Sequence, residues 1–175
     1  MRQVPSTPDL SDTAAVHRLT FRRVDYDHAD VQALVALVQA EYVRIYGGKD
    51  ATPMDSGQFA PPSGAFLVGY LGEEPVVMGG WRFRPDVTAP GGVRPAEIKR
   101  MFVVDAHRRT GLARAVIAEL ERTATVAGAD LMILETGTPQ IGAEEFYRSC
   151  GYTDTVRFGH YAHEPHTVYL GKPLA

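Results

Sequence analysis

The sequence EIKRMFVVDAHRRTGLARAVIAELE, residues 97–121, joins three patterns that together indicate the fold. Residues 97–104 are strand-like, and a basic turn follows them in front of a lone glycine, Gly111. Beyond the turn, apolar residues recur at helical spacing, which predicts an amphipathic helix over residues 111–128. A strand that runs through a tight turn into a helix is typical of proteins in which helices cover a sheet.

The start of this helix can hold an anion. The first N–H groups of a helix have no partner within the helix, and they lie at the positive end of its dipole. Gly111 allows a bulky group to approach the backbone, and Arg108 and Arg109 add positive charge. The stretch is neither a Walker A loop nor a GxGxxG fingerprint, because the required residues are missing. The residues alone therefore leave two interpretations, a phosphate site and a solvated basic turn.

The rest of the chain supplies further strands and helices on either side of this stretch. A long loop rich in Gly and Pro, residues 47–64, interrupts them. The periodicity predicts strands over residues 19–24, 65–71, 75–83, 130–136 and 167–174, and helices over residues 29–45 and within 139–152. Asp27 or Asp30 can cap the first of these helices, and Gly47 can end it. The order of elements predicts a mixed sheet covered by helices.

Length and composition fit one domain that folds alone. The chain has 175 residues, and we expect a flexible leader over residues 1–18 and a single domain over residues 19–175. Lys and Arg number 18 against 21 Asp and Glu, so the net charge of -3 gives no reason to expect a nucleic acid as partner. The single cysteine, Cys150, cannot form an internal disulfide, and no apolar run is long enough for a signal peptide or a membrane span. The simplest expectation is a cytoplasmic protein.

Arg108, Gly111 and Ala113 form R-x-x-G-x-A, which resembles the pyrophosphate-binding signature of the GNAT superfamily of N-acetyltransferases. The resemblance extends from Glu97 to Tyr152 with the elements in the same order, and more loosely over residues 19–172. Two positions depart from the family pattern, since proline is common in place of Asp105 and a small residue in place of Arg109. Neither departure removes a backbone donor.

The resemblance implies a fold of the α/β (α+β mixed) class. It has a central twisted sheet of six to seven mostly antiparallel strands, about four helices, and splayed fourth and fifth strands. Acetyl-CoA would be the co-substrate and would lie in the wedge between those two strands. The backbone of Met101, Phe102 and Val103 would pair with its pantetheine arm. Its pyrophosphate would be held by the N–H groups of Arg108, Arg109, Thr110, Gly111, Leu112, Ala113 and Arg114.

Acetyl transfer to an amine needs a base for the amine and an acid for the departing thiolate. The resemblance implies that Glu97 is the base, although a charged residue at a strand end could simply pair with Lys99 or Arg100. Glu135 is the competing base, because a carboxylate in an apolar strand must be satisfied by a hydrogen bond or by a substrate ammonium. Tyr147 occupies the place of the family's acid, and the alternative is a core residue on an apolar helix stripe.

Three variable regions recognise the acceptor in this family: the first helix, the loop after it and the last hairpin. Acidic and aromatic side chains in these regions suit a cationic amine, but many would be solvated on any helix face. The acceptor could be a small molecule or a peptide. The candidate acceptor residues are Glu41, Tyr42, Tyr46 and Glu135, with Asp50, His160 and Tyr161 nearby.

These observations favour an N-acetyltransferase that transfers an acetyl group directly from acetyl-CoA to a primary amine within a ternary complex. The alternatives are a non-catalytic acetyl-CoA sensor and a generic binder of nucleotide phosphates. We expect no bound metal, because His160, His163 and His166 are spaced by three around a proline and have no cysteine partners. Cys150 is expected to be a buried small side chain rather than a nucleophile. Family members are often dimers, which slightly favours a homodimer.

Overall fold

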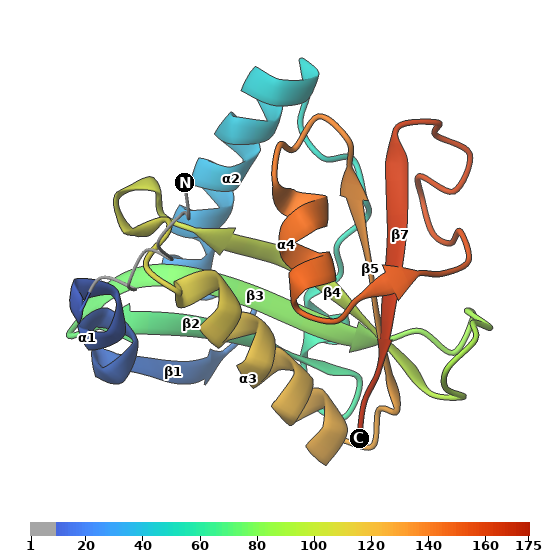
Figure 1. The fold of residues 1–175 in the computed structure, drawn as a ribbon, viewed down its shortest axis with the longest axis horizontal. Coiled ribbons are helices and arrows are strands. Elements are labelled where there is room, and N and C mark those ends of the chain that lie inside the picture. Colours follow the sequence, from blue (N-terminus) through green and yellow to red (C-terminus); the bar gives the residue numbers. More distant parts are fainter. Residues whose placement is uncertain (1–9) are drawn as a thin grey trace, which may run out of the picture.

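A seven-stranded sheet forms the centre of the computed structural model, which describes residues 10–175 (Figure 1). Its strand order is β1-β2-β3-β4-β5-β7-β6. Only β4 and β5 are parallel, and every other neighbouring pair is antiparallel. The strands are β1 (Leu19–Val24), β2 (Gly64–Leu71), β3 (Glu74–Phe83), β4 (Pro95–Val103), β5 (Leu131–Gly137), β6 (Thr153–Asp154) and β7 (Thr167–Pro173). The predicted mixed and mostly antiparallel sheet is confirmed.

Helices cover both faces of this sheet. Helix α3 (Leu112–Val126) buries Leu112, Val116 and Leu120 in the core of one face, where α4 (Ala143–Ser149) adds Tyr147. Helix α2 (Ala29–Tyr46) packs on the opposite face through the side chains Val31, Leu34 and Val38. Figure 1 shows α3 and α4 in front of the sheet and α2 behind it. No helix within residues 10–175 is both long and apolar enough to cross a membrane.

Residues 10–18 form a helix, α1 (Leu10–Arg18), whereas we expected a flexible leader over residues 1–18. The prolines that suggested an irregular segment stand at positions 5 and 8, and LSDTAAVHR after them contains no helix breaker. Helix α1 lies beside the first turn of α3 (Figure 1), and a Cβ atom added at Gly111 would lie 3.2 Å from Val16 Cγ2. The remainder of the expected leader, residues 1–9, lies outside the described residues.

The ends of α2 agree with the sequence only in part. Gly47 ends the helix in a left-handed conformation with φ 77°, as predicted. The N-terminal cap is His28, whose Nδ1 accepts from the backbone N–H of Asp30, and not Asp27 or Asp30. The carboxylate of Asp30 instead accepts a hydrogen bond from the hydroxyl of Tyr70 at 2.7 Å. The expected cap was wrong because this tertiary bond to β2 takes the Asp30 side chain away from the helix end.

The loop between α2 and β2 is anchored to the sheet. It contains a short 3-10 helix, η1 (Ser56–Phe59), where the sequence predicted no regular element. Phe59 is buried against Phe66 of β2 and Tyr26, with ring centroids 5.6 and 5.4 Å away. This aromatic contact holds the loop against the α2 side of the sheet, next to the site described below.

The close packing under η1 generates a stability prediction. A Cβ atom on Gly80 would lie 2.5 Å from Phe66 Cδ2 and 2.9 Å from Phe59 Cδ1, so Gly80→Ala should lower the free energy of unfolding by about 1–3 kcal/mol. Gly48→Ala is the matched control, since a Cβ there meets no atom of the described residues within 4 Å. Urea denaturation measures both, and an unchanged midpoint for Gly80→Ala would contradict this packing.

Candidate active site

Strands β4 and β5 separate soon after they meet. Their parallel ladder joins only Pro95–Glu97 to Leu131–Ile133. Beyond it lies a cavity of about 500 Å³, the wedge cavity, lined by the next residues of both strands, by Tyr42 and Tyr46 of α2 and by Tyr147 of α4. Residues 98–103 of β4 therefore have a backbone edge without a strand partner in the described part of the chain, and an extended ligand can pair with it.

A bulge in β4 lies at the same place. Gly80 of β3 faces Lys99 and Met78 faces Phe102, so one residue of β3 stands opposite two of β4. The extra residue is Arg100, whose φ of 58° lies in the left-handed region that favours glycine. A non-glycine residue in that region costs about 1–3 kcal/mol, and such strain is concentrated at functional sites. The bulge bends β4 away from β5 and turns Lys99 and Arg100 toward the wedge cavity.

The turn before α3 exposes its backbone donors. Arg109 and Gly111 both have positive φ, 64° and 82°, and Gly111 caps α3 without a side-chain hydrogen bond. Within residues 10–175, no backbone bond uses the N–H groups of Arg109, Thr110 or Gly111. Free N–H groups at a helix start, reached through a turn of this kind, suit an anion. Three of the predicted pyrophosphate donors, the N–H groups of Arg109, Thr110 and Gly111, are therefore free within the described part of the chain, whereas the N–H of Arg108 donates to the Asp105 carbonyl.

The Arg108 side chain has a structural partner. Its Nη2 donates to Glu41 Oε2 at 2.6 Å and lies 3.0 Å from Asp105 Oδ1, while its Nε donates to the Val103 carbonyl. Glu41, which we expected near the acceptor, lines neither of the two cavities at the site. This ion pair ties the turn to α2. Because the Arg108 N–H also donates to the Asp105 carbonyl at 3.2 Å, the free backbone donors of the turn begin at Arg109.

Tyr147 projects from α4 into the wedge cavity. Its side chain is buried, and the closest hydrogen-bonding atom of its hydroxyl is Met101 Sδ at 3.8 Å. Burial raises the pKa of Tyr147 well above its usual value, with smaller contributions from Tyr42 and Cys150. The hydroxyl is thus protonated at neutral pH and faces the part of the cavity bordered by β4. The expected position of Tyr147 agrees with an acid role, which remains a prediction.

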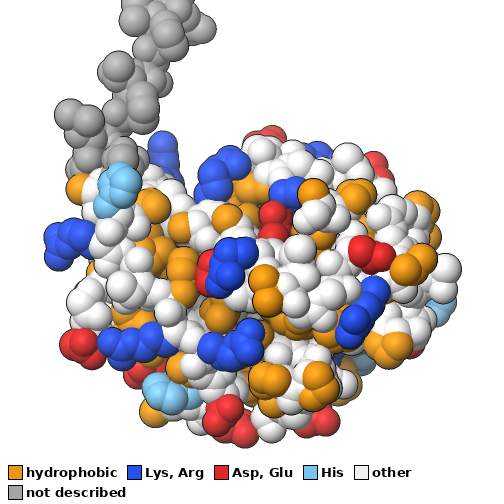
Figure 2. Space-filling model, turned by 90° about the horizontal axis from the view of Figure 1, so that it is seen from below, with side chains coloured by type: hydrophobic (Ala, Val, Ile, Leu, Met, Phe, Trp, Pro, Cys, Tyr) orange, Lys and Arg blue, Asp and Glu red, His pale blue; other side chains and the backbone are white. Residues whose placement is uncertain are grey.

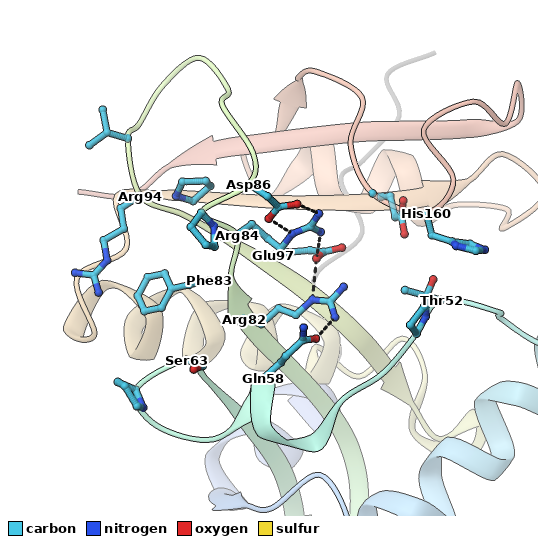
Figure 3. Close-up of a pocket in the computed structure, with 17 residues that line it drawn as sticks. Thr52, Gln58, Ser63, Arg82, Phe83, Arg84, Asp86, Arg94, Glu97 and His160 are labelled. Carbon is cyan, nitrogen blue, oxygen red and sulfur yellow. Dashed lines mark hydrogen bonds and ion pairs between the residues drawn. The ribbon is translucent and has the colours of Figure 1, made fainter.

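Glu97 lies in a second cavity of about 890 Å³ on the α2 side of the sheet, between the end of β3 and the loops around residues 52–63 and 159–160. Figure 3 shows Arg82 and Arg84 converging on Glu97, and both guanidinium groups donate to the same oxygen, Oε2. The Glu97 side chain is only 2% exposed. Its second oxygen is 4.0 Å from Lys99 Nζ. Glu97 is therefore ion-paired, as the alternative to catalysis expected, but its close partners are Arg82 and Arg84 rather than Lys99 or Arg100.

Glu135 joins the two cavities, since it lines both. Its Oε1 accepts from Lys99 Nζ at 3.2 Å, whereas its buried Oε2 has no partner among residues 10–175. Burial raises the pKa of the Glu135 carboxyl, although the nearby Lys99 opposes this effect. A carboxylate with a free oxygen and a raised pKa can accept a proton, and its position lets it act on either cavity.

Asp50 links three segments around the wedge cavity. Its Oδ1 accepts from the hydroxyl of Tyr161 at 2.8 Å and from Thr52, and its Oδ2 lies 3.4 Å from Arg100 Nη2. Burial alone would raise the pKa of Asp50, but Lys99, the Thr52 hydrogen bonds and Arg100 hold it below its usual value. This aspartate is ionised, and it connects the loop after α2 to the bulge of β4 and to the loop before β7.

Sequence reasoning did not identify Arg82 and Arg84, and it named Lys99 and Arg100 only as possible partners of Glu97. Arg82, Arg84 and Arg100 are almost fully buried, and Arg82 and Arg84 bond to a glutamate 13–15 positions away. The available signal was the stretch WRFRP, in which charged residues alternate with aromatic ones inside a buried strand. In the part of the chain that the structure describes, no three His, Cys, Asp or Glu side chains are arranged to hold a metal ion.

The fold and the site together define a protein that can hold an extended arm along β4 and an anion at the start of α3. Residues 31–152 match the profile of the acetyltransferase (GNAT) family, so the chain belongs to that family. An "IAA acetyltransferase" of Azospirillum brasilense is 36% identical over 78 residues, which are 45% of this chain and 51% of that protein. The chain thus aligns with about half the length of this curated relative.

Solved structures of the same fold support this assignment. A protein of Klebsiella pneumoniae, provisionally described as an acyl-CoA N-acyltransferase, is 25% identical and superposes with a TM-score of 0.74, covering 90% of this chain and 98% of its own. A GNAT acetyltransferase of Elizabethkingia anophelis, solved with acetyl-CoA bound, is 14% identical with a TM-score of 0.62, covering 90% and 99%. The second likeness concerns the fold alone.

The turn before α3 predicts how acetyl-CoA binding should respond to mutation. Gly111→Val places a β-branched side chain at φ 82° and 3.2 Å from Val16 Cγ2, so the turn must change and the Kd for acetyl-CoA should rise roughly tenfold or more. Arg109→Gln keeps the main-chain donors and should raise the Kd less than about fivefold. Isothermal titration calorimetry compares the two, and equal losses would argue against a main-chain phosphate site.

Proposed function

We propose that this chain is a cytoplasmic N-acetyltransferase that transfers an acetyl group from acetyl-CoA directly to a primary amine within a ternary complex. One observation carries the proposal: the unpaired edge of β4 and the side chain of Tyr147 border the same wedge cavity, and β4 leads directly into the turn with the free N–H groups before α3. Met101, Phe102 and Val103 would pair with the pantetheine arm, and residues 108–114 would hold the pyrophosphate. This arrangement would bring the thioester to the bulge of β4, between Tyr147 and Glu135.

Glu135 is the group that we favour as the base. The attacking amine must lose a proton, and a carboxylate serves best when it is not already neutralised by fixed cations. One oxygen of Glu97 accepts hydrogen bonds from two arginines. Glu135 accepts a hydrogen bond from Lys99 alone, and its Oε2 has no partner among the described residues. The raised pKa of Glu135 further increases its basicity. Glu97 would then hold Arg82, Arg84 and Lys99 in place.

The transfer involves two proton movements. The amine nitrogen attacks the thioester carbonyl carbon, its proton passes to Glu135, and the C–S bond breaks as the tetrahedral intermediate collapses. The departing CoA thiolate takes the proton of the Tyr147 hydroxyl. Before the next turnover, Glu135 releases its proton to solvent and Tyr147 takes one up, so both groups return to their starting states. Lys99 places a positive charge beside Glu135 and the cavity, where it would stabilise the negative charge that develops on the carbonyl oxygen.

Substitution of the two glutamates separates their roles. Glu135→Gln should lower kcat about 100-fold or more and remove the acidic limb of the pH profile. That limb arises because activity falls as Glu135 becomes protonated, and its raised pKa places the fall above the usual pH range for a glutamate. Glu97→Gln should lower the free energy of unfolding and keep the acidic limb. Thiol release from acetyl-CoA over a broad panel of amines measures activity.

The opposite result, an acidic limb that disappears in Glu97→Gln and persists in Glu135→Gln, would return the base role to Glu97. If acetyl-CoA binds in calorimetry but none of the amines in the panel causes release of CoA, the protein is a non-catalytic acetyl-CoA sensor. Equal competition by ADP and CoA would indicate a generic binder of nucleotide phosphates.

Tyr147→Phe tests the acid. The substitution keeps the ring in its place against Phe146 and Tyr152 and removes only the hydroxyl, so the fold should persist while kcat falls about 100-fold. A stopped-flow measurement of thiolate release, together with near-UV circular dichroism, separates lost chemistry from lost structure. Unchanged turnover in a folded variant would assign Tyr147 to the core.

A further inference from the structure

Seven charged side chains form a buried cluster where the two cavities meet, which we call the junction cluster. None of these side chains is more than 14% exposed. The cations are Arg82, Arg84, Lys99 and Arg100, and the carboxylates are Asp50, Glu97 and Glu135. The cluster therefore contains one more positive than negative side chain. Asp86 also pairs with Arg84 through two hydrogen bonds, but it lies outside the buried cluster at 62% exposure, where water screens its charge, so it compensates the buried excess only in part.

A buried excess charge is unfavourable unless a partner compensates it. Arg82 donates to Glu97 and Gln58, and Arg84 donates to Glu97 and Asp86, so both guanidinium groups are well supplied with acceptors. Lys99 donates to Glu135. The excess charge must therefore be compensated at the remaining cation, Arg100, or at the groups next to it.

Arg100 lacks partners to an unusual degree for a buried guanidinium. Its side chain is 4% exposed, its Nε and Nη1 have no hydrogen-bond partner within residues 10–175, and its one carboxylate neighbour, Asp50, is 3.4 Å away. Arg100 also lines the wedge cavity, next to Lys99 in the chain. An arginine is suited to bind a carboxylate, since its planar fork of donors matches the two oxygens.

We propose that the acceptor carries a carboxylate beside its amine, as an amino acid does, and that this carboxylate binds at Arg100 while the amine reaches Glu135. This inference rests on the proposed acetyltransferase function. Lys99 connects the two points, because it directly precedes Arg100 in the chain and donates to Glu135 at 3.2 Å, so the two acceptor groups need only a short spacer. A bound carboxylate would make the junction cluster neutral.

The sequence led us to expect a cationic amine held by acidic and aromatic side chains. The proposal narrows this class to amines that also carry a carboxylate. The tyrosines of the wedge cavity remain available to the body of the acceptor. A phosphate beside an amine would offer the same negative charge and the same bidentate geometry, so the test includes an aminophosphate next to the carboxylates. We favour the carboxylate because the junction cluster has an excess of only one positive charge, whereas a phosphate carries up to two negative charges.

The experiment compares amino acids with their amides in the thiol-release assay. The amide keeps the amine and removes the negative charge, and its amine loses protons more readily because no carboxylate stabilises the ammonium. Chemical reactivity alone would therefore favour the amide. We expect kcat/KM to be at least about tenfold higher for the best amino acid than for its amide, and higher than for O-phosphoethanolamine. Amides that react as fast as the acids would overturn the proposal.

Two variants with opposite expected effects localise the carboxylate. Arg100→Gln removes the excess charge, so the ratio of kcat/KM for the amino acid to kcat/KM for its amide should fall to about one. Asp50→Asn keeps an oxygen acceptor for Thr52 and Tyr161 and increases the excess, so the preference should rise. Arg122→Gln is the control, since this arginine is exposed on α3 and pairs only with Glu119 among the described residues. A preference that neither Arg100→Gln nor Asp50→Asn changes would overturn the proposal.

A binding measurement keeps the test independent of turnover. Calorimetry of the CoA-loaded protein with an N-acetyl amino acid and with its amide should show tighter binding of the acid in the wild type and in Asp50→Asn. If Arg100→Gln fails to fold, Asp50→Asn alone decides the question. If no amine releases CoA, the acetyltransferase proposal fails, while a preference for the acid in calorimetry would still support the carboxylate site, and equal binding of acid and amide would contradict it.

Discussion

The ladder between β4 and β5 is only three residues long, and the rest of the site depends on this constraint. The bulge at Arg100 adds a residue to β4 and bends it, so the two strands cannot continue side by side. Their separation leaves a strand edge free, and it opens a cavity between two otherwise buried strands. The turn before α3 follows the free edge directly. A ligand paired with β4 would thus meet the positive end of a helix without any rearrangement of the fold.

The same bend brings charged side chains into the interior. Lys99 and Arg100 lie at the bulge, and the carboxylates of Glu135 and Asp50 approach them from β5 and from the loop after α2. Buried ion pairs contribute little net stability, because desolvation of the charges offsets much of their attraction. The junction cluster is therefore better explained by the positions that it imposes. It fixes two carboxylates beside the cavity, and through Tyr161 it ties the flanking loops together.

The sequence predicted the parts of the structure that depend on local patterns. The sheet, α2, α3 and the left-handed Gly47 follow from periodicity and from turn residues, and the free donors before α3 follow from one contiguous motif. Helix α1 was missed because the prolines at positions 5 and 8 suggested an irregular segment, although residues 10–18 contain no helix-breaking residue. The pairing of Glu97 with two arginines was also missed, because Arg82 and Arg84 reach it across neighbouring strands, and sequence spacing alone does not give strand register.

Glu97 and Glu135 illustrate why residue type and position in a motif do not assign a chemical role. Both carboxylates lie on paired strands and border the same cavity, and Lys99 stands near each of them. Two guanidinium groups occupy one oxygen of Glu97, and this favours a structural role. Glu135 has one cationic partner and a buried oxygen without a partner among the described residues, and this favours proton uptake. Two carboxylates held in different environments can divide support and proton transfer between them, and here the arginines of β3 and the loop after it create the difference.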